Sequence, residues 1–418
     1  MNSRLLKLAL VTRRYPPLIG GAEKVLSYLA YALAAEGAEV TVLTSRMPEL
    51  KLPAREESLI PFLKNASLRS GDTSGRLTVV RLETSWLRFW GTWRYMQNLG
   101  RWFRNNPVDL AYVSMLKHDA YTVVGAGTRL GFPVVLRPEG AGATGDLAWQ
   151  GWGNFGRIIG RRCRQSTAFV AISKAIEREL REAWKTGTMR PPRFGDKRQE
   201  ETTVLRIQAI PNGVPVPEFA WHRRANWQTA PRAIFMGRLA PEKGLDTLIN
   251  AWPVIRATYP DAQLILKGEG PLRPMLEERV RTLGMTLGPG QAVDMPGSTA
   301  DPIEALRGAD LFVLPSREEG MSIALLEAMA LGIPLVASSI HGNRQLVGDF
   351  KHGRLVPPDD PQALARVISD QWENFDRAFH MSRAARSRVE QEFSIQRMAR
   401  NHLALFEDIL DQRRRAKN

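Results

Sequence analysis

The sequence predicts an α/β fold with two doubly wound domains, each a mostly parallel sheet with helices on both faces. Short apolar segments of strand length alternate with segments of helical spacing through most of the 418 residues. The alternation begins again after a Trp- and Arg-rich linker at residues 218–232. Because a chain of this length exceeds a typical single core, two domains are expected, at residues 1–212 and 213–393, with the crossover at 211–213.

The first domain is predicted from strand-length apolar segments separated by amphipathic ones. Helical spacing is clearest at residues 22–35 and 174–184. Strands that alternate with helices in this way are typical of a parallel sheet. The expected strands are residues 7–12, 40–44, 77–82, 110–113, 134–136, 169–172 and 207–210.

The second domain repeats the pattern after the linker. Its expected strands are residues 233–236, 263–266, 311–314, 335–337 and 354–356. Its expected helices are residues 245–258, 272–283, 302–308, 321–331 and 361–369. The Gly-containing segment at residues 295–299 is interpreted as a loop at a strand end.

Composition excludes several classes of protein. The hydrophobic content of 44% and charged content of 24% are those of a soluble globular chain. The single cysteine, Cys163, excludes an internal disulfide framework and cysteine-based zinc sites, and favours a cytoplasmic location. No apolar run approaches the roughly 20 residues that a membrane-spanning helix needs.

The positive charge is concentrated in the first half of the chain. Residues 1–210 carry 32 Lys and Arg against 18 Asp and Glu, whereas the rest is nearly balanced. This asymmetry indicates an anionic partner, such as a membrane surface, an anionic acceptor or a nucleic acid. Residues 85–104 interleave aromatic and Arg side chains, which fits either an interfacial membrane helix or a core-facing helix with a basic outer side.

Gly20 and Gly21 stand between the first expected strand and the next helix. Backbone N–H groups at such a helix N-terminus suit a phosphate or a sugar oxygen. The segment lacks the GxGxxG fingerprint, so the sequence does not support a nicotinamide enzyme. A plain turn is the alternative interpretation of the pair.

Arg238 and Lys243 occupy the same position in the second domain, in the loop after its first strand. The carboxyl ends of strands line the ligand crevice of a doubly wound sheet, where two cations can hold a diphosphate. Either cation alone is interpreted more simply as a solvated surface charge.

The segment "REEGMSIALLEAMALGIPLVAS", residues 317–338, places carboxylates beside a further helix start. Glu318 is interpreted as a solvated charge. Glu319 and Glu327 lie on either side of an apolar run, roughly 12 Å apart along a helix axis. Because carboxylates repel a diphosphate, their expected targets are sugar hydroxyls, with phosphate at the helix amides and the cations between them.

These motifs, taken in order, resemble the retaining glycosyltransferases of family 4, which have the GT-B fold. The resemblance rests on Gly20-Gly21, "IPNGV" at residues 210–214, "GRLAPEKG" at 237–244, and the E-x7-E element at 319–327. It implies two Rossmann-like domains that face a central cleft, with a C-terminal helix at about 394–418 packing on the first domain. It also implies a metal-independent enzyme without a cofactor.

The resemblance assigns roles on the donor side. Arg238 and Lys243 would bind the diphosphate of a UDP- or GDP-sugar, Glu319 the transferred sugar, and Glu327 the ribose. Gly20 and Gly21 would lie at the junction of donor and acceptor. Phosphate would meet the amides of Gly320, Met321, Ser322 and Ile323. Met321-Ser322 departs from the commonest family pattern, so contacts to the sugar are expected to differ.

The acceptor side follows the family pattern less closely. Glu319 and His118 are the predicted catalytic residues. His118 stands after a strand end, where the resemblance places a histidine near the reacting sugar; a surface histidine is the alternative. The Gly-rich loop "RPEGAGATGD", residues 137–146, offers Arg137, Glu139 and Asp146 as acceptor-binding candidates.

The sequence therefore predicts a hexosyltransferase that moves a sugar, with retention, from a nucleotide-diphosphate donor to a hydroxyl of a lipid-linked or saccharide acceptor. Polysaccharide or glycolipid assembly at the inner face of a plasma membrane is the expected setting, with peripheral attachment through the basic half. A nucleic-acid-binding protein is the alternative of another class, although no reader motif for nucleic acid is present. An epimerase or phosphorylase of the same fold is the other alternative.

Overall fold

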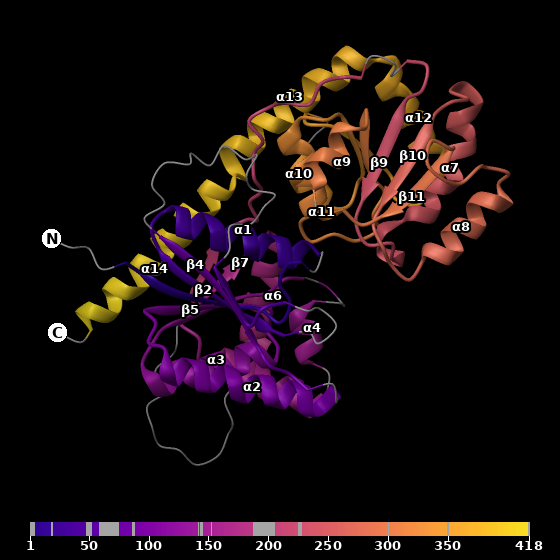
Figure 1. Cartoon of the computed structure of the whole chain (residues 1–418). Helices are drawn as coiled ribbons and strands as arrows, with labels where there is room; N and C mark the ends of the chain where they lie inside the picture. The colour runs from indigo at the N-terminus through magenta and orange to yellow at the C-terminus, as the bar shows by residue number, and fades with distance from the viewer. Residues whose placement is uncertain are drawn as a thin grey trace.

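The chain folds into two lobes that lie side by side, joined by a long C-terminal helical segment that runs from one to the other (Figure 1). The computed structural model describes residues 5–17, 20–46, 52–57, 75–85, 88–140, 142, 145–151, 153–186, 205–224, 228–299, 301–348 and 351–416. Each lobe is built on one sheet, and the two sheets follow one another in the sequence. The predicted α/β architecture with two doubly wound sheets is confirmed.

The N-terminal lobe contains an eight-stranded sheet in the order β3-β4-β2-β1-β5-β6-β7-β8, parallel except for β3 at its edge. The strand order reverses between β1 and β5, which is where ligands bind in folds of this kind. The strands are β1 (Lys7–Val11), β2 (Glu39–Ser45), β3 (Arg55–Glu57), β4 (Arg76–Leu82), β5 (Leu110–Ser114), β6 (Val134–Arg137), β7 (Ala168–Ala171) and β8 (Ile207–Ala209).

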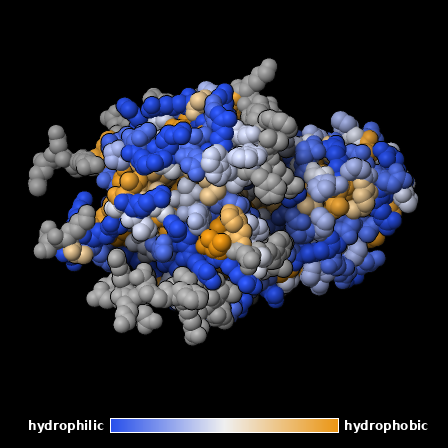
Figure 2. Space-filling view, turned by 90° about the horizontal axis from the view of Figure 1, so that it is seen from below, coloured by the Kyte–Doolittle hydropathy of each residue, from blue (hydrophilic) through white to orange (hydrophobic). Residues whose placement is uncertain are grey.

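Helices cover both faces of this sheet, because successive side chains of each strand point to opposite sides. In β1, Leu8 and Leu10 join one buried apolar cluster, and Ala9 and Val11 join another. The helices are α1 (Gly21–Ala35), α2 (Arg88–Asn105), α3 (His118–Leu130), α4 (Asp146–Gln150), α5 (Gly153–Cys163) and α6 (Lys174–Thr186). Figure 2 shows the molecule from below, where a mostly hydrophilic surface carries a small central hydrophobic patch.

The C-terminal lobe contains a six-stranded sheet in the order β11-β10-β9-β12-β13-β14. All its pairings are parallel, and the order reverses between β9 and β12. Its strands are β9 (Arg232–Met236), β10 (Gln263–Lys267), β11 (Val293–Gly297), β12 (Leu311–Leu314), β13 (Leu335–Ser338) and β14 (Arg354–Val356). Its helices are η3 (Pro241–Lys243, a 3-10 turn), α7 (Leu245–Thr258), α8 (Arg273–Thr282), α9 (Pro302–Arg307), α10 (Ile323–Leu331), α11 (His341–Val347) and α12 (Pro361–Glu373).

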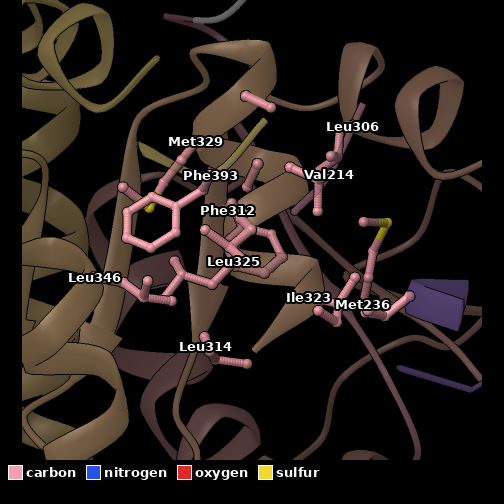
Figure 3. Close-up of a cluster of buried hydrophobic side chains, with 14 of the residues drawn as sticks. Val214, Met236, Leu306, Phe312, Leu314, Ile323, Leu325, Met329, Leu346 and Phe393 are labelled. Atoms are coloured by element: carbon pink, nitrogen blue, oxygen red, sulfur yellow. The ribbon is translucent and has the colours of Figure 1, made fainter. Parts of the chain in front are cut away.

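Helix α10 is enclosed by the lobe on nearly all sides. Figure 3 shows Leu325 and Met329 of this helix among Phe312 of β12, Leu346 of α11 and Phe393. A helix that is apolar all round is typical of a protein core. The carboxylate of Glu327, on the same helix, is therefore surrounded by protein rather than by solvent.

The C-terminal segment returns to the N-terminal lobe, as expected. Helix α13 (Phe375–Glu392) packs on α10, and α14 (Ile395–Arg415) packs on α1. The chain passes from the first lobe to the second near Val214 and returns near Phe393. Backbone hydrogen bonds join these two segments, from Val214 N to Phe393 O at 2.8 Å and from Ile395 N to Val214 O at 3.1 Å. His402 of α14 then contacts the Tyr112 hydroxyl of β5 at 3.1 Å.

The predicted strands agree with the observed ones to within one or two residues, and two strands were missed. Strand β3 is a three-residue, charged edge strand without an apolar pattern. Strand β11 ends in Pro296 and Gly297, so the segment at 295–299 that we interpreted as a loop is partly strand. Proline is tolerated there because β11 lies at the sheet edge. Helix α10 begins at Ile323, two residues after the predicted start.

Candidate functional site

The loops that follow β9 and β12 meet at the carboxyl edge of the C-terminal sheet, because these two strands are neighbours. Their backbones are joined by a hydrogen bond from Arg317 N to Glu242 O at 2.8 Å. This brings Lys243 beside Glu319, with 2.7 Å between Nζ and Oε1. The Ser316 hydroxyl donates to the same carboxylate oxygen at 2.9 Å. Two predicted donor-binding residues therefore form one ion pair at the mouth of the sheet.

Two glycines allow these loops to pack closely. Gly244 has a left-handed φ of +62°, and a Cβ there would lie 2.2 Å from the Pro315 carbonyl oxygen. A Cβ on Gly342, at the start of α11, would lie 2.4 Å from the Glu319 carbonyl oxygen. Any larger residue at either position would displace the loop that carries Glu319.

The start of α10 lies beside Glu319. Ser322 is the N-cap residue, and its hydroxyl accepts a hydrogen bond from Leu325 N at 3.3 Å. Gly320 and Met321 precede the cap, and the Ile323 amide opens the helix, where N–H groups suit an anion. Arg238 is exposed at the carboxyl end of β9. The residues predicted to hold phosphate thus occupy one edge of this sheet.

Glu327 lies one turn further along α10 and faces the N-terminal lobe. Its side chain is only 2% exposed, and Lys24 of α1 contacts it at 3.1 Å. The Tyr28 hydroxyl, one turn further along α1, donates to the same carboxylate at 2.8 Å. Sequence analysis did not find Lys24 or Tyr28. Their positions one and two helical turns after Gly20-Gly21, on one face of the helix, were the available signal.

Gly20 and Gly21 lie across from the start of α10. Gly20 is the N-cap of α1, and a Cβ on Gly21 would lie 3.6 Å from Cγ1 of Ile323. The two helix N-termini therefore face each other across the lobes. The Glu23 carboxylate folds back over Gly20 and pairs with Arg14 at 3.3 Å.

His118 is the first residue of α3, at the reversal point of the N-terminal sheet. The turn before it contains Met115, whose φ of +73° is strained for a residue with a side chain. The His118 ring lies 5.7 Å from that of Trp149 and 5.2 Å from that of Phe155, between ring centroids. Burial, Arg13 and Lys117 together lower the His118 pKa, so the ring is neutral at pH 7. Aromatic rings around a neutral imidazole form a surface suited to a sugar ring.

Arg137, Glu139 and Asp146 form one hydrogen-bonded network, in which Arg137 and Asp146 are buried. Arg137 donates to Glu139 at 2.7 Å and to Asn212 of the crossover at 2.5 Å. Ser114 also donates to Glu139, and the Asp146 carboxylate accepts from the Glu139 backbone at 2.8 Å. Burial raises the pKa of both carboxyl groups. Arg137 and Asp146 thus hold Glu139 in place, and acceptor binding by the three residues remains a prediction.

The described residues contain neither a metal-binding cluster nor a helix that could span a membrane. No group of three or more His, Cys, Asp or Glu side chains in these residues is arranged to hold a metal ion. None of the described helices is both long and apolar enough to cross a bilayer.

Family models match both lobes of the chain. Residues 20–192 match the model described as "Glycosyl transferase 4-like domain", and residues 230–374 match "Glycosyl transferases group 1". The glycogen synthase of Mycobacterium tuberculosis is 25% identical over 94% of this chain and 92% of its own length. A phosphatidyl-myo-inositol mannosyltransferase of the same organism is 33% identical over 38% of this chain and 42% of its own length.

Solved structures share the fold of the whole chain. Sucrose-phosphate synthase from Thermosynechococcus elongatus has a TM-score of 0.72 at 19% identity, covering 97% of this chain and 100% of that one. The Anabaena protein HepE, solved with UDP-glucose, has a TM-score of 0.71 at 18% identity, covering 96% of this chain and 100% of that one.

Proposed function

Because the chain belongs to the family 4 (group 1) glycosyltransferases of GT-B fold, which use nucleotide sugars, we propose that it transfers a hexosyl group with retention to an acceptor hydroxyl. One observation carries the proposal. The Lys243–Glu319 ion pair lies beside the start of α10, and Ile323 there faces Gly21, so a cation, a carboxylate and helix amides of one lobe meet the N-terminus of α1 from the other.

Each donor-side residue has a physical role in this proposal. Arg238, Lys243 and the first amides of α10 stabilise the negative charge that develops on the leaving diphosphate. Glu319 accepts hydrogen bonds from hydroxyls of the transferred sugar, and Glu327 accepts them from the ribose. The acceptor oxygen bonds to the anomeric carbon from the face that the diphosphate leaves. The departing phosphate oxygen takes the acceptor proton, so no protein nucleophile is needed.

The acceptor is proposed to be a saccharide or a lipid-linked saccharide that lies along the N-terminal lobe. His118, Trp149 and Phe155 offer ring faces and edges to a sugar, and Glu139, in the loop after β6, offers a hydrogen-bond acceptor. Similarity to a phosphatidyl-myo-inositol mannosyltransferase supports an acceptor in glycolipid or polysaccharide assembly. Family membership favours transfer over the nucleic-acid-binding alternative.

We infer further that the N-terminal lobe attaches to the inner face of an anionic membrane. Trp90 and Trp93 on α2 are 63% and 55% exposed, and their rings touch at 5.8 Å between centroids. Phe155 and Ile158 on α5 are also exposed, at 52% and 44%, and α2 and α5 both pack on α3. The lower face carries a hydrophobic patch within a hydrophilic surround (Figure 2). Aromatic side chains beside Arg are typical of an interfacial surface.

Co-sedimentation with vesicles tests this attachment. Vesicles with anionic lipid should bind the protein, and the double change Trp90→Ser with Trp93→Ser should weaken binding at least several-fold. The matched change of Trp221→Phe, a buried residue of the other lobe, should leave vesicle binding as in the wild type. Equal binding by wild type and the double variant would remove α2 from the proposal.

The transfer itself is tested first by ligand binding. UDP-, GDP- and ADP-sugars are screened by thermal shift, since only a sugar nucleotide that binds the folded state raises the midpoint. The donor so found is incubated with saccharide and glycolipid acceptors, and NMR reports the anomeric configuration of the product. Retention supports the proposal. Inversion, dependence on inorganic phosphate, or epimerised donor without transfer would each contradict it.

A further inference from the structure

The carboxylate of Glu327 accepts hydrogen bonds from two side chains of the opposite lobe. Lys24 Nζ lies 3.1 Å from Oε1 and 3.3 Å from Oε2, and the Tyr28 hydroxyl lies 2.8 Å from Oε1. Burial, followed by the charge of Glu327, raises the Tyr28 pKa far above its usual value, so this hydroxyl stays protonated and donates. A carboxylate has about four acceptor positions, and these contacts occupy three of them.

The contacts lie on a continuous seam between α1 and α10. Gly21 faces Ile323 at the start of both helices. Glu327, one turn further along α10, meets Lys24 and Tyr28, which lie one and two turns further along α1. Residues three or four positions apart share one face of a helix, so both sides of the seam are single stripes. The seam therefore begins at the donor–acceptor junction and ends at the carboxylate assigned to the ribose.

Because the Glu327 carboxylate is buried, losing a hydrogen-bond donor costs it more free energy than it would cost an exposed carboxylate. Glu327 is 2% exposed and the Lys24 side chain is 18% exposed, so solvent screens the pair little. Removing one partner of a buried pair leaves an uncompensated charge, which is strongly unfavourable. A ribose diol that binds Glu327 through both hydroxyls needs two acceptor positions and finds one open, so it must displace a donor that is already in place.

We propose that Lys24 and Tyr28 are positioning residues that hold Glu327 across the lobes, and that the donor's ribose diol exchanges with Lys24 for this carboxylate. The inference rests on the proposed function, since it takes Glu327 as the ribose-binding residue. Nucleotide binding is thereby coupled to the contact between lobes: the Lys24–Glu327 pair holds the nucleotide-free protein closed, and the ribose takes over the carboxylate when the donor enters. Tyr28 keeps one oxygen oriented in both states.

The test compares nucleotides with and without the two ribose hydroxyls. UDP, GDP and ADP, and their 2′,3′-dideoxy forms, are titrated calorimetrically into wild type and Lys24→Met. In wild type the diol gains Glu327 only by displacing Lys24, so the preference for the ribonucleotide should be small. In Lys24→Met the diol meets an under-coordinated carboxylate, and the preference should rise about tenfold, the scale of one hydrogen bond to a charged group.

Further variants separate positioning from folding. Lys24→Arg restores a cation and should keep the wild-type preference. Tyr28→Phe preserves shape and should raise the preference less than Lys24→Met, because Lys24 still competes. Lys174→Met, an exposed cation on α6, is the matched control and should change nothing. Small-angle scattering of nucleotide-free Lys24→Met should give a larger radius of gyration than wild type and control.

The outcomes distinguish this inference from the proposed function. If a nucleotide binds but Lys24→Met keeps the wild-type preference and radius, the exchange is wrong while glycosyl transfer stands. If Glu327→Gln also leaves the preference unchanged, Glu327 does not bind the ribose. If none of the three nucleotides binds the wild type, the proposed function fails, and the inference with it.

Discussion

The proposed donor side and the proposed acceptor side of the site hold their charged groups in different ways. On the donor side, Lys243 and Glu319 pair across two short loops, with side chains 19% and 10% exposed. On the acceptor side, Arg137 is 2% exposed and pairs with Glu139, while the ring of Phe155 beside His118 is 52% exposed. The donor side thus presents its charges to a ligand, and the acceptor side uses its charges to support a surface.

This difference suggests that the two lobes have different functions. A diphosphate and a ribose are constant parts of a sugar nucleotide, and charges on fixed loops suit them. Acceptors vary among glycosyltransferases, and a surface of rings on a buried polar frame can change its shape without losing its support. Substitutions on the donor side should therefore impair chemistry first, and those on the acceptor side should impair stability first.

The largest expected effect is that of Glu319→Ala. The carboxylate contacts the polar side chains of Lys243 and Ser316 in a loop, so folding should be retained. Loss of a charged contact to the transferred sugar should lower kcat/KM about 10²- to 10³-fold, as for other groups that stabilise a transition state. Steady-state rates of sugar transfer measure this.

The adjacent carboxylate provides the matched control. Glu318 is exposed, and Glu318→Ala should keep kcat/KM within about twofold of wild type, the usual range for a surface change. Full activity of Glu319→Ala, or equal loss in both variants, would contradict the assignment of the transferred sugar to Glu319.

Arg137→Met should produce the next largest effect, on stability. The change leaves the Glu139 carboxylate buried without its cation and removes the hydrogen bond to Asn212 at the crossover. Breaking a buried pair in this way costs roughly 3 kcal/mol or more in the free energy of unfolding. Urea denaturation followed by circular dichroism gives the value.

An exposed ion pair tests whether burial is the cause. Arg181 pairs with Glu177 on α6, and its side chain is 54% exposed. Arg181→Met should lower the free energy of unfolding by less than about 0.5 kcal/mol, because solvent screens such pairs. If Arg137→Met and Arg181→Met lowered the free energy of unfolding equally, burial of the Arg137–Glu139 pair would not be the cause of the loss.

The sequence predicted the donor side in more detail than the acceptor side. Arg238, Lys243 and Glu319 lie in short segments after regular strands, so strand positions and the E-x7-E spacing were enough to bring them to one edge. The Lys24–Glu327 contact joins residues 303 positions apart and depends on how the lobes meet. No local pattern carries that information.

On the acceptor side, the sequence indicated which residues lie together but not how deeply they are buried. Arg137, Glu139 and Asp146 were chosen as polar residues of a Gly-rich loop, and they do lie together. Their burial follows from α4 and the crossover at Asn212 packing over them, which is a tertiary effect. Trp149 and Phe155 sit on α4 and α5, two short helices that the strand pattern did not predict.

The smallest expected effect concerns Asp119, on α3 beside His118. Burial raises its pKa to about 6, with Arg13 and the Tyr95 hydroxyl opposing the rise. The native state therefore keeps a proton that the unfolded chain releases near pH 4, so this group's contribution to stability falls as pH rises from about 4 to 6. Asp119→Asn removes the titration. The free energy of unfolding of Asp119→Asn minus that of wild type should therefore increase by roughly 2 kcal/mol between pH 4 and pH 7.

Urea denaturation at several pH values measures this difference, and Asp261→Asn, at an exposed site, is the control. The control difference should stay flat across the same range, because the Asp261 side chain is exposed to solvent in the folded protein as it is in the unfolded chain. A flat profile for Asp119→Asn would mean that Arg13 holds Asp119 ionised. Arg13 and Asp119 would then be an oppositely charged pair beside His118, as Lys243 and Glu319 are on the donor side. If the difference in the free energy of unfolding rises with pH, Asp119 stays protonated in the folded protein. A buried carboxyl group of the N-terminal lobe would then make the stability of the protein depend on pH.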